Sequence, residues 1–330
     1  MAWVVERSRS GAIFLPQLGW HLDAQARTDA SFVSHAHSDH LGRHRTVLCT
    51  AATARLMAVR LPGRRESIVL PFGERWPLGP DAAVTLYPAG HILGSAQWLA
   101  ETAHGRLLYT GDFKVRPGAS TEPCATPRAD VLIMETTFGK PRYRFPPAES
   151  VTADIVTFCQ SAIADRAVPF LHCYSLGKSQ EVLARLAGSG LPIMLHPQAA
   201  RMAEIYETFG VRFPPYRRFE PDEAAGHVVI GPPEIDRSPD VRRVRRQRSA
   251  VITGWALDPW TVPRHRYDAA FPLSDHADYD DLLHFVARVE PRVVYTVHGF
   301  ASEFARDLRE RGIEAWALGR ENQLDLGLLR

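Results

Sequence analysis

The stretch Ser34-His35-Ala36-His37-Ser38-Asp39-His40-Leu41-Gly42 places three imidazoles and one carboxylate within six residues. It follows the short apolar run Ser31–Val33, which predicts a strand that ends in a tight turn. Imidazole is the most common metal ligand in proteins, and carboxylate oxygens complete sites for zinc, manganese or iron. The spacing suits two ligand pairs, because the first two histidines lie two residues apart and the third is adjacent to the acid. A polar turn that happens to be rich in histidine is the alternative interpretation.

Length and composition limit the classes of protein that are compatible with this loop. The chain has 330 residues, enough for one large domain or two ordinary ones, and a formal charge of +2, so any basic surface must be local. The N-terminus lacks a signal-peptide core, and no apolar run of about 18 residues occurs, so we expect a cytoplasmic protein without a membrane span. The cysteines are too far apart for a zinc knuckle or a redox motif, and we expect free thiols at Cys49, Cys124, Cys159 and Cys173.

Four further polar residues follow apolar segments that predict strands. They are His91, Asp112, Glu135 and His298, and the expected strands cover residues 83–87, 106–110, 130–134 and 292–297. A glutamate at the end of an apolar strand is costly to bury unless it has a partner. Each of these residues alone also has a purely structural interpretation. Their order along the chain is the more informative feature.

The loop at 34–42 resembles the signature of the metallo-β-lactamase superfamily of hydrolases, and His91, Asp112 and His298 stand in the order that this signature requires. Glu135 and His276, together with the late His298, resemble the motifs of the β-CASP nucleases, a branch that acts on nucleic acids. The bacterial exonucleases associated with DNA ligases are the most similar group, through the stretches Pro88–Gln97, Gly111–Lys114 and Glu135–Pro141. The resemblance implies an αββα sandwich with an inserted β-CASP-like α/β cap, and it places Asp23 behind the metal loop.

The resemblance also implies two divalent metal ions per chain, either zinc or manganese. One ion would take His35, His37, His91 and Asp112, and the other would take Asp39, His40, Asp112 and His298. A hydroxide between them would be the nucleophile, and the carboxylate of Asp112 would bridge the ions at roughly 3.5–4 Å separation. The residues with catalytic roles would be His276, Glu135 and Asp39.

His276 is the expected proton donor, because the ligand places on both ions are filled without it. Glu135 would accept a hydrogen bond from the His276 ring and favour its protonated form. The alternative is a structural His276 held by Asp275 or Asp278.

The middle of the chain changes character. Residues 149–209 alternate expected helices and strands, a pattern that predicts a small Rossmann-like layer. We therefore expect a metallo-β-lactamase domain at residues 1–148 and 249–330 and a cap at residues 149–248. In this division the strand that begins at Ser249 returns to the first domain.

Two basic features of the expected cap predict contacts with phosphate. The segment Tyr174–Glu181 is a glycine-containing turn into a helix, in which Ser175 and Lys178 would hold phosphate with backbone amides. The segment 242–248 contains five arginines, and a strip of phosphate contacts would use Arg242, Arg243, Arg245 and Arg246. An ordinary α/β turn and a solvated charged face are the respective alternatives.

These features predict a metal-dependent nuclease that hydrolyses DNA, acting as an exonuclease in DNA repair, with a DNA ligase or other repair proteins as partners. An RNA-processing nuclease is the alternative with the same chemistry. A small-molecule hydrolase has no use for a basic cap, and an inactive binding module has no need of an intact ligand set.

Overall fold

The computed structural model describes residues 3–7, 12–261 and 267–318, which form two compact units. Unit 1 comprises Met1–Arg144 and His276–Arg330, and unit 2 comprises Phe145–Asp275. The expected free thiols are found at all four cysteines. Among the described residues, no helix has the length and apolar character that a membrane crossing needs.

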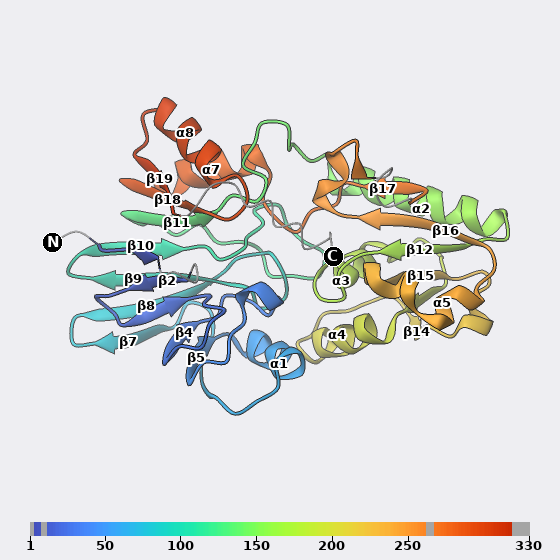
Figure 1. The fold of residues 1–330 in the computed structure, drawn as a ribbon, viewed down its shortest axis with the longest axis horizontal. Helices are drawn as coiled ribbons and strands as arrows, with labels where there is room; N and C mark the ends of the chain where they lie inside the picture. Colours follow the sequence, from blue (N-terminus) through green and yellow to red (C-terminus); the bar gives the residue numbers. More distant parts are fainter. Residues whose placement is uncertain (1–2, 8–11, 262–266, 319–330) are drawn as a thin grey trace. The chain divides into compact units, whose positions relative to one another are not determined.

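Unit 1 contains two sheets (Figure 1). The strands of the six-stranded sheet, in spatial order, are β1 (Glu6–Arg7), β2 (Ile13–Leu15), β3 (Trp20–Leu22), β4 (Ala30–Phe32), β5 (Thr46–Cys49) and β6 (Glu66–Val69). Those of the seven-stranded sheet are β19 (Ala315–Ala317), β18 (Val293–Val297), β11 (Val131–Glu135), β10 (Gly105–Tyr109), β9 (Ala96–Thr102), β8 (Ala82–Pro88) and β7 (Arg75–Gly79). Helix α1 (Ala51–Arg60) contacts β6. Helices α7 (Tyr279–Val289) and α8 (Ala301–Glu310) pack against the seven-stranded sheet.

The alternation of side chains along the strands builds the layers of unit 1. Leu107 and Tyr109 of β10 join Phe32 and other residues of the first sheet in one core cluster. Leu108 points to the opposite face and packs with α7 and α8 residues such as Phe285. Strands covered on both faces are apolar in continuous runs, as in β11, where Val131–Met134 are apolar and all five residues, with Glu135 at the end, are buried. The result is the expected αββα sandwich.

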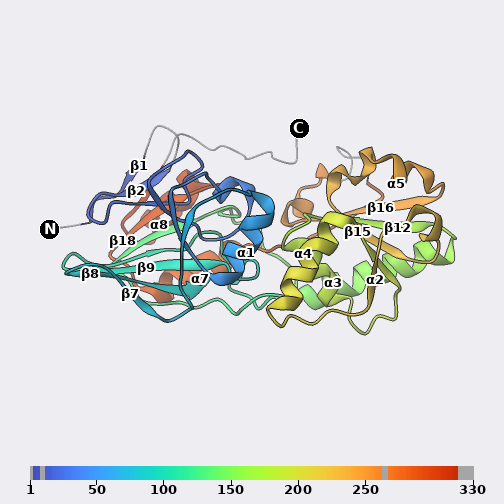
Figure 2. The same cartoon turned by 90° about the horizontal axis from the view of Figure 1, so that it is seen from below.

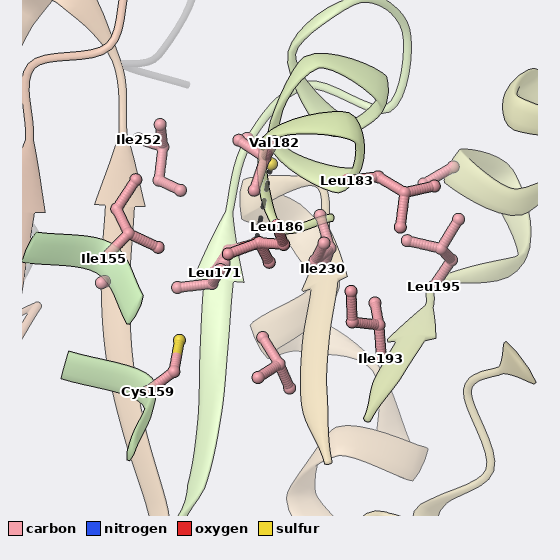
Figure 3. Close-up of a cluster of buried hydrophobic side chains, with 14 of the residues drawn as sticks. Ile155, Cys159, Leu171, Val182, Leu183, Leu186, Ile193, Leu195, Ile230 and Ile252 are labelled. Atoms are coloured by element: carbon pink, nitrogen blue, oxygen red, sulfur yellow. Dashed lines mark hydrogen bonds between the residues drawn. The ribbon is translucent and has the colours of Figure 1, made fainter. Parts of the chain in front are cut away.

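Unit 2 is a parallel α/β layer in strand order β14-β13-β15-β12-β16-β17. Its elements are α2 (Ala148–Ala164), β12 (Val168–His172), α3 (Lys178–Arg185), β13 (Ile193–Leu195), α4 (Pro197–Thr208), β14 (Tyr216–Arg218), β15 (Val228–Gly231), α5 (Pro239–Arg243), β16 (Gln247–Ile252) and β17 (Ala269–Phe271). Helices α2, α3 and α4 cover one face of the sheet through the cluster in Figure 3. Helix α5 lies on the other face (Figure 2), and its Val241 shares a core cluster with Phe170 of β12. The predicted Rossmann-like alternation is present.

The place where the chain returns to unit 1 differs from the sequence-based prediction. The strand at Ser249 does not join unit 1, because β16 pairs in parallel with β12, with Phe170 opposite Ser249, and Ala250 and Ile252 complete the core of unit 2. The division falls at 144/145 and 275/276 rather than at 148/149 and 248/249. The ends of the expected first domain, 1–2 and 319–330, lie outside the described residues.

Candidate metal centre

The carboxylate of Asp23 organises the loop that follows β4. Asp23 follows β3 with a left-handed φ of 47°, and its Oδ1 accepts a hydrogen bond from the backbone N of Ser34 at 2.7 Å. Its Oδ2 accepts from the Ser34 hydroxyl at 2.5 Å and from the Tyr109 hydroxyl at 2.9 Å, and it lies 2.8 Å from His40 Nδ1. The loop therefore has a fixed path, and the other nitrogen of His40, Nε2, faces Asp112.

One compact group of donor atoms joins three segments of unit 1. It consists of His35, His37, His91 and Asp112, whose ligand atoms all lie within 4.8 Å of one another. His37 Nδ1 lies 3.0 Å from His35 Nε2 and 3.1 Å from His91 Nε2. Asp112 Oδ2 lies 3.6 Å from His35 Nε2 and 3.9 Å from His91 Nε2.

These separations fit a divalent cation. Four ligands about 2.0–2.1 Å from a tetrahedral ion are about 3.3 Å apart, close to the separations observed. The three imidazole nitrogens converge on one point together with a carboxylate oxygen, which is the chemistry of a zinc-type donor set. A purely structural histidine cluster has no reason to direct its nitrogens in this way.

A second group of donors lies beside the first and is more open. His40 Nε2 is 3.2 Å from Asp112 Oδ2 and 3.6 Å from Asp39 Oδ2, and the Asp39 side chain is 53% exposed. His298, also exposed, follows β18 with φ 57°, and its ring centre is 5.6 Å from that of His40. Asp112 thus stands between the two groups, in the position that a shared ligand requires.

The electrostatics of Asp112 and His35 favour the protonation states that a cation needs, whereas those of His40 favour a charged ring. Burial alone would raise the pKa of Asp112, but the neighbouring His40 and its hydrogen bond hold that pKa well below the usual range. Burial and the neighbouring imidazoles lower the pKa of His35 well below its usual value. Burial opposes a charged His40, yet the carboxylates of Asp112, Asp39 and Asp23 raise its pKa well above normal. The ionised Asp112 and the neutral His35 are therefore ready to bind metal, whereas His40 would release a proton on binding.

His276 lies next to this cluster and is held by Glu135. Glu135 is 1% exposed, and its Oε1 lies 2.8 Å from His276 Nδ1, which is the contact expected from the sequence. The backbone N of Thr137 donates to Oε2 of the same carboxylate at 2.8 Å. The ring of His276 stands 4.6 Å from that of His91, centre to centre. The imidazole is therefore oriented through Nδ1.

Asp278, one of the two acids expected to hold a structural His276, caps a helix and pairs with an arginine. Its Oδ1 accepts a hydrogen bond from the backbone N of Asp281 at 2.9 Å and caps helix α7. Its Oδ2 pairs with Arg116. Glu135 is thus the acid whose contact with the His276 ring is seen within unit 1.

Comparisons with known proteins agree with this geometry. Residues 269–318 match the Zn-dependent metallo-hydrolase RNA specificity domain, RMMBL. The chain is 58% identical over 329 residues, 99% of its length, to a protein of Opitutus terrae named as a probable DNA ligase, of which it spans 32%. It is 28% identical to the chicken 5' exonuclease Apollo over 79% of the chain and 56% of that protein. An RNase J-like protein of Methanocaldococcus jannaschii is 29% identical over 47% of the chain and 42% of that protein.

These matches support a place for the chain in the metallo-β-lactamase/β-CASP nuclease family. A solved structure of a protein of unknown function from Enterococcus faecalis V583 shares the fold, with a TM-score of 0.60, 16% identity and coverage of 90% of this chain and 80% of that one. The donor cluster and the metallo-hydrolase match support a divalent metal centre in this chain. The chain spans between about a third and just over half of the curated relatives described here.

The contacts of Lys178 differ from the phosphate-binding role expected from the sequence. The Lys178 side chain is buried, at 2% exposure, and its Nζ donates to Leu273 O at 2.8 Å and pairs with Asp275 Oδ1 at 2.9 Å. The turn before α3 is also occupied, since the backbone N of Gly177 donates to Gln180 Oε1 at 2.7 Å. Within the described part of unit 2, the ammonium and this amide therefore hold the turn together instead of facing a phosphate. Ser175 is partly exposed, and its hydroxyl donates to a glutamine side chain at 3.4 Å.

The arginine strip is on the surface, as expected. Arg242, Arg243, Arg245 and Arg246 are all exposed. Arg243 pairs with Asp222 at 2.6 Å and lies 3.8 Å from Asp240. No carboxylate among the described residues pairs with the other three.

Sequence reasoning missed two residues that support the loop. Tyr109 ends β10 and reaches Asp23, and Gly111 approaches Ser34 so closely that an added Cβ would lie 2.5 Å from the serine Cβ. Gly111 also has φ 55°, which an L side chain rarely adopts. The sequence contained part of this information, because Tyr109 and Gly111 stand just before Asp112.

Proposed function

We propose that this protein is a metal-dependent nuclease that hydrolyses phosphodiester bonds in DNA, as an exonuclease in DNA repair. The observation that carries the proposal is the convergence of His35, His37, His91 and Asp112 beside the His276–Glu135 pair. Unit 1 would be the metallo-β-lactamase domain and unit 2 the β-CASP-like cap.

In this proposal the two donor groups hold two divalent ions, zinc or manganese. The first group would bind one ion, and Asp39, His40, Asp112 and His298 would bind the other. When bound, the ions supply a hydroxide near neutral pH and stabilise negative charge on the phosphate. Asp23 would fix His40 by its 2.8 Å contact with Nδ1, so that Nε2 stays directed at the centre.

His276 would protonate the departing oxygen. An alkoxide is a poor leaving group unless it receives a proton, and histidine can supply one near neutral pH. Glu135 accepts from Nδ1, leaves Nε2 as the nitrogen that meets the leaving group, and favours the charged ring. The buried position of the Glu135 carboxylate, with a hydrogen bond from Thr137 N, fixes the direction of this contact.

DNA is the proposed substrate because the ligase-named relative spans 99% of the chain and the Apollo relative is named as a 5' exonuclease. By the same reasoning, a DNA ligase or another repair protein is the proposed partner and the cytoplasm the proposed location. RNA is the second candidate, favoured by the RNA specificity domain matched at residues 269–318 and by the RNase J-like relative.

One assay separates the candidate activities. Purified protein is loaded with zinc or manganese and incubated with end-labelled single-stranded DNA, duplex DNA, RNA of the same sequence, and a lactone. We expect progressive shortening of DNA, faster than that of RNA, and no lactone hydrolysis. Faster cleavage of RNA would assign the protein to RNA processing. Lactone hydrolysis without nucleic-acid cleavage would reject the nuclease.

A further inference from the structure

A cavity of about 620 Å³ opens on unit 1 and is lined mainly by arginine. Its lining includes Arg27, Arg43, Arg45, Arg64, Arg65 and Glu66. They lie just before, or at the start of, strands β4, β5 and β6. These strands pair in parallel, so their N-terminal ends lie together at one end of the sheet. We call this cavity the arginine pocket. Its volume is in the range of small-molecule and nucleotide sites.

The pocket concentrates positive charge without matching acid. Five guanidinium groups line it, whereas Glu66 is its single carboxylate, and that carboxylate accepts a hydrogen bond from the Thr46 hydroxyl at 3.1 Å. Among the described residues, none of the five arginines has a carboxylate within ion-pair distance. Like charges this close destabilise one another, so the arrangement costs free energy unless an anion is bound.

Arg65 supplies an independent observation. Its guanidinium is partly buried, and one of its nitrogens donates to Leu61 O. A second nitrogen, Nη1, is buried and lacks a hydrogen-bond partner within the described part of the chain. Burial lowers the pKa of Arg65, and the positive charge of Arg43 adds to that effect. A buried donor left unpaired is costly, and an anion in the pocket would satisfy it after the Arg65 side chain turns toward the opening.

We propose that the arginine pocket binds backbone phosphates of the nucleic-acid strand that is cleaved at the metal centre, an inference that rests on the proposed function. The loop between β4 and β5 carries His40 and then, three residues later, Arg43. The Cα atoms of these two residues are therefore no more than about 11 Å apart. Each strand of a B-form duplex carries one phosphate per about 3.4 Å of helix axis, so about three phosphates of such a strand cover this distance.

Guanidinium suits this ligand because it presents a planar fork of donors that binds two phosphate oxygens together. A free anion such as pyrophosphate carries the same chemistry. A strand differs in one respect, because it makes several contacts at once and releases several counterions. The salt dependence of binding therefore distinguishes the two sources.

The test uses a charge-matched pair of triple variants of the full, metal-loaded protein. The pocket variant changes exposed arginines to glutamine at Arg43, Arg45 and Arg64, and the control variant does the same at Arg55, Arg288 and Arg306. The probe is a fluorescent single-stranded oligonucleotide with phosphorothioate linkages, which resists hydrolysis. Anisotropy gives Kd between 50 and 200 mM salt, and metal content and thermal unfolding are measured in parallel.

We expect the control to bind like the wild type. The pocket variant should bind more weakly, and its log–log salt slope should be smaller by about 2, since each single-strand contact contributes about 0.7. Wild-type affinity should then fall about 20-fold more than variant affinity across this salt range. Metal content and unfolding temperature should match the wild type.

Equal Kd and slope for the pocket variant and the wild type would overturn the proposal. Calorimetry with inorganic pyrophosphate provides the second arm, and binding of pyrophosphate lost in the pocket variant, with oligonucleotide binding unchanged, would assign the pocket to a small anion instead. Failure of the proposed function has a different signature, because the pocket effect would remain while wild-type protein left normal DNA intact.

Discussion

Two segments that follow parallel strands, at Ser34–Gly42 and Tyr174–Glu181, are both rich in polar residues. In the first, the nitrogens of His35 and His37 face a carboxylate and the nitrogen of His91, which comes from the segment after β8. In the second, the Lys178 ammonium already has Asp275 and a carbonyl as partners. The donor atoms of the first loop are arranged to bind a cation, whereas the Lys178 ammonium of the second loop already pairs with protein groups.

The difference gives a physical criterion for a binding site. Polar groups that serve the fold find complementary partners inside it, because an unpaired buried charge costs free energy. Polar groups that serve a ligand are held by outer partners, as Asp23 holds His40, while their inner atoms are directed at one another. The residues most sensitive for function should therefore be those of the first loop's cluster, and those most sensitive for stability should include Lys178.

The largest effect is expected from Asp112→Ala. Removing the carboxylate that stands between both donor groups should lower metal content and reduce DNA hydrolysis by about 10³-fold or more, because the activating charge is lost. Metal analysis and end-labelled DNA digestion measure both. Full activity at normal metal content would show that the cluster is structural, like the second loop.

His276→Ala tests whether a residue beside the cluster moves a proton. We expect a loss of about 10²–10⁴-fold on DNA and a small loss on an ester with a nitrophenolate leaving group, which needs little protonation. Metal content should stay unchanged, and His284→Ala, an exposed histidine on α7, is the control. Equal losses on both substrates would rule out the proton donor and leave His276 as a ligand or scaffold residue.

Lys178→Met tests the self-contained loop. The change leaves Asp275 buried without its ammonium, so the free energy of unfolding should fall by about 3–5 kcal/mol. Urea denaturation measures this, and adding Asp275→Leu should restore part of the loss. The salt slope for DNA binding should not change. Unchanged stability with a smaller slope would return Lys178 to the phosphate-binding role predicted from the sequence.

The sequence predicted best what depends on neighbours along the chain. The run Val131–Met134 is apolar because both faces are covered, and that pattern is visible without a structure. The membership of β16 was not visible, because a buried parallel strand has the same pattern whichever sheet it joins. Likewise, the sequence around Lys178 does not indicate that Asp275, which lies far along the chain, forms an ion pair with it.

The candidate site shows the same limit. The contact of Glu135 with His276 was expected through a family resemblance, and the structure contains it. The arginine pocket was not expected, because its residues come from three separate loops. Only the parallel pairing of β4, β5 and β6 brings those loops to one edge.

The smallest effect is expected within the arginine strip of unit 2, and it applies the same criterion to exposed residues. Arg243 already has Asp222 and Asp240 as partners, so its replacement should release few additional counterions and hardly change the salt slope. Arg245 has no carboxylate partner in the described part of the chain, so Arg245→Ala should reduce the slope for single-stranded DNA by about 0.7. The two variants carry the same change in net charge, so a general loss of attraction would affect them equally, and anisotropy titrations from 50 to 200 mM salt compare them directly. Equal reductions would mean that the Asp222 pair gives way to phosphate, as an exposed ion pair of low strength can do. No reduction in either variant would make the strip a solvated face, and the nucleic-acid contacts of the protein would then have to lie elsewhere, first of all in the arginine pocket.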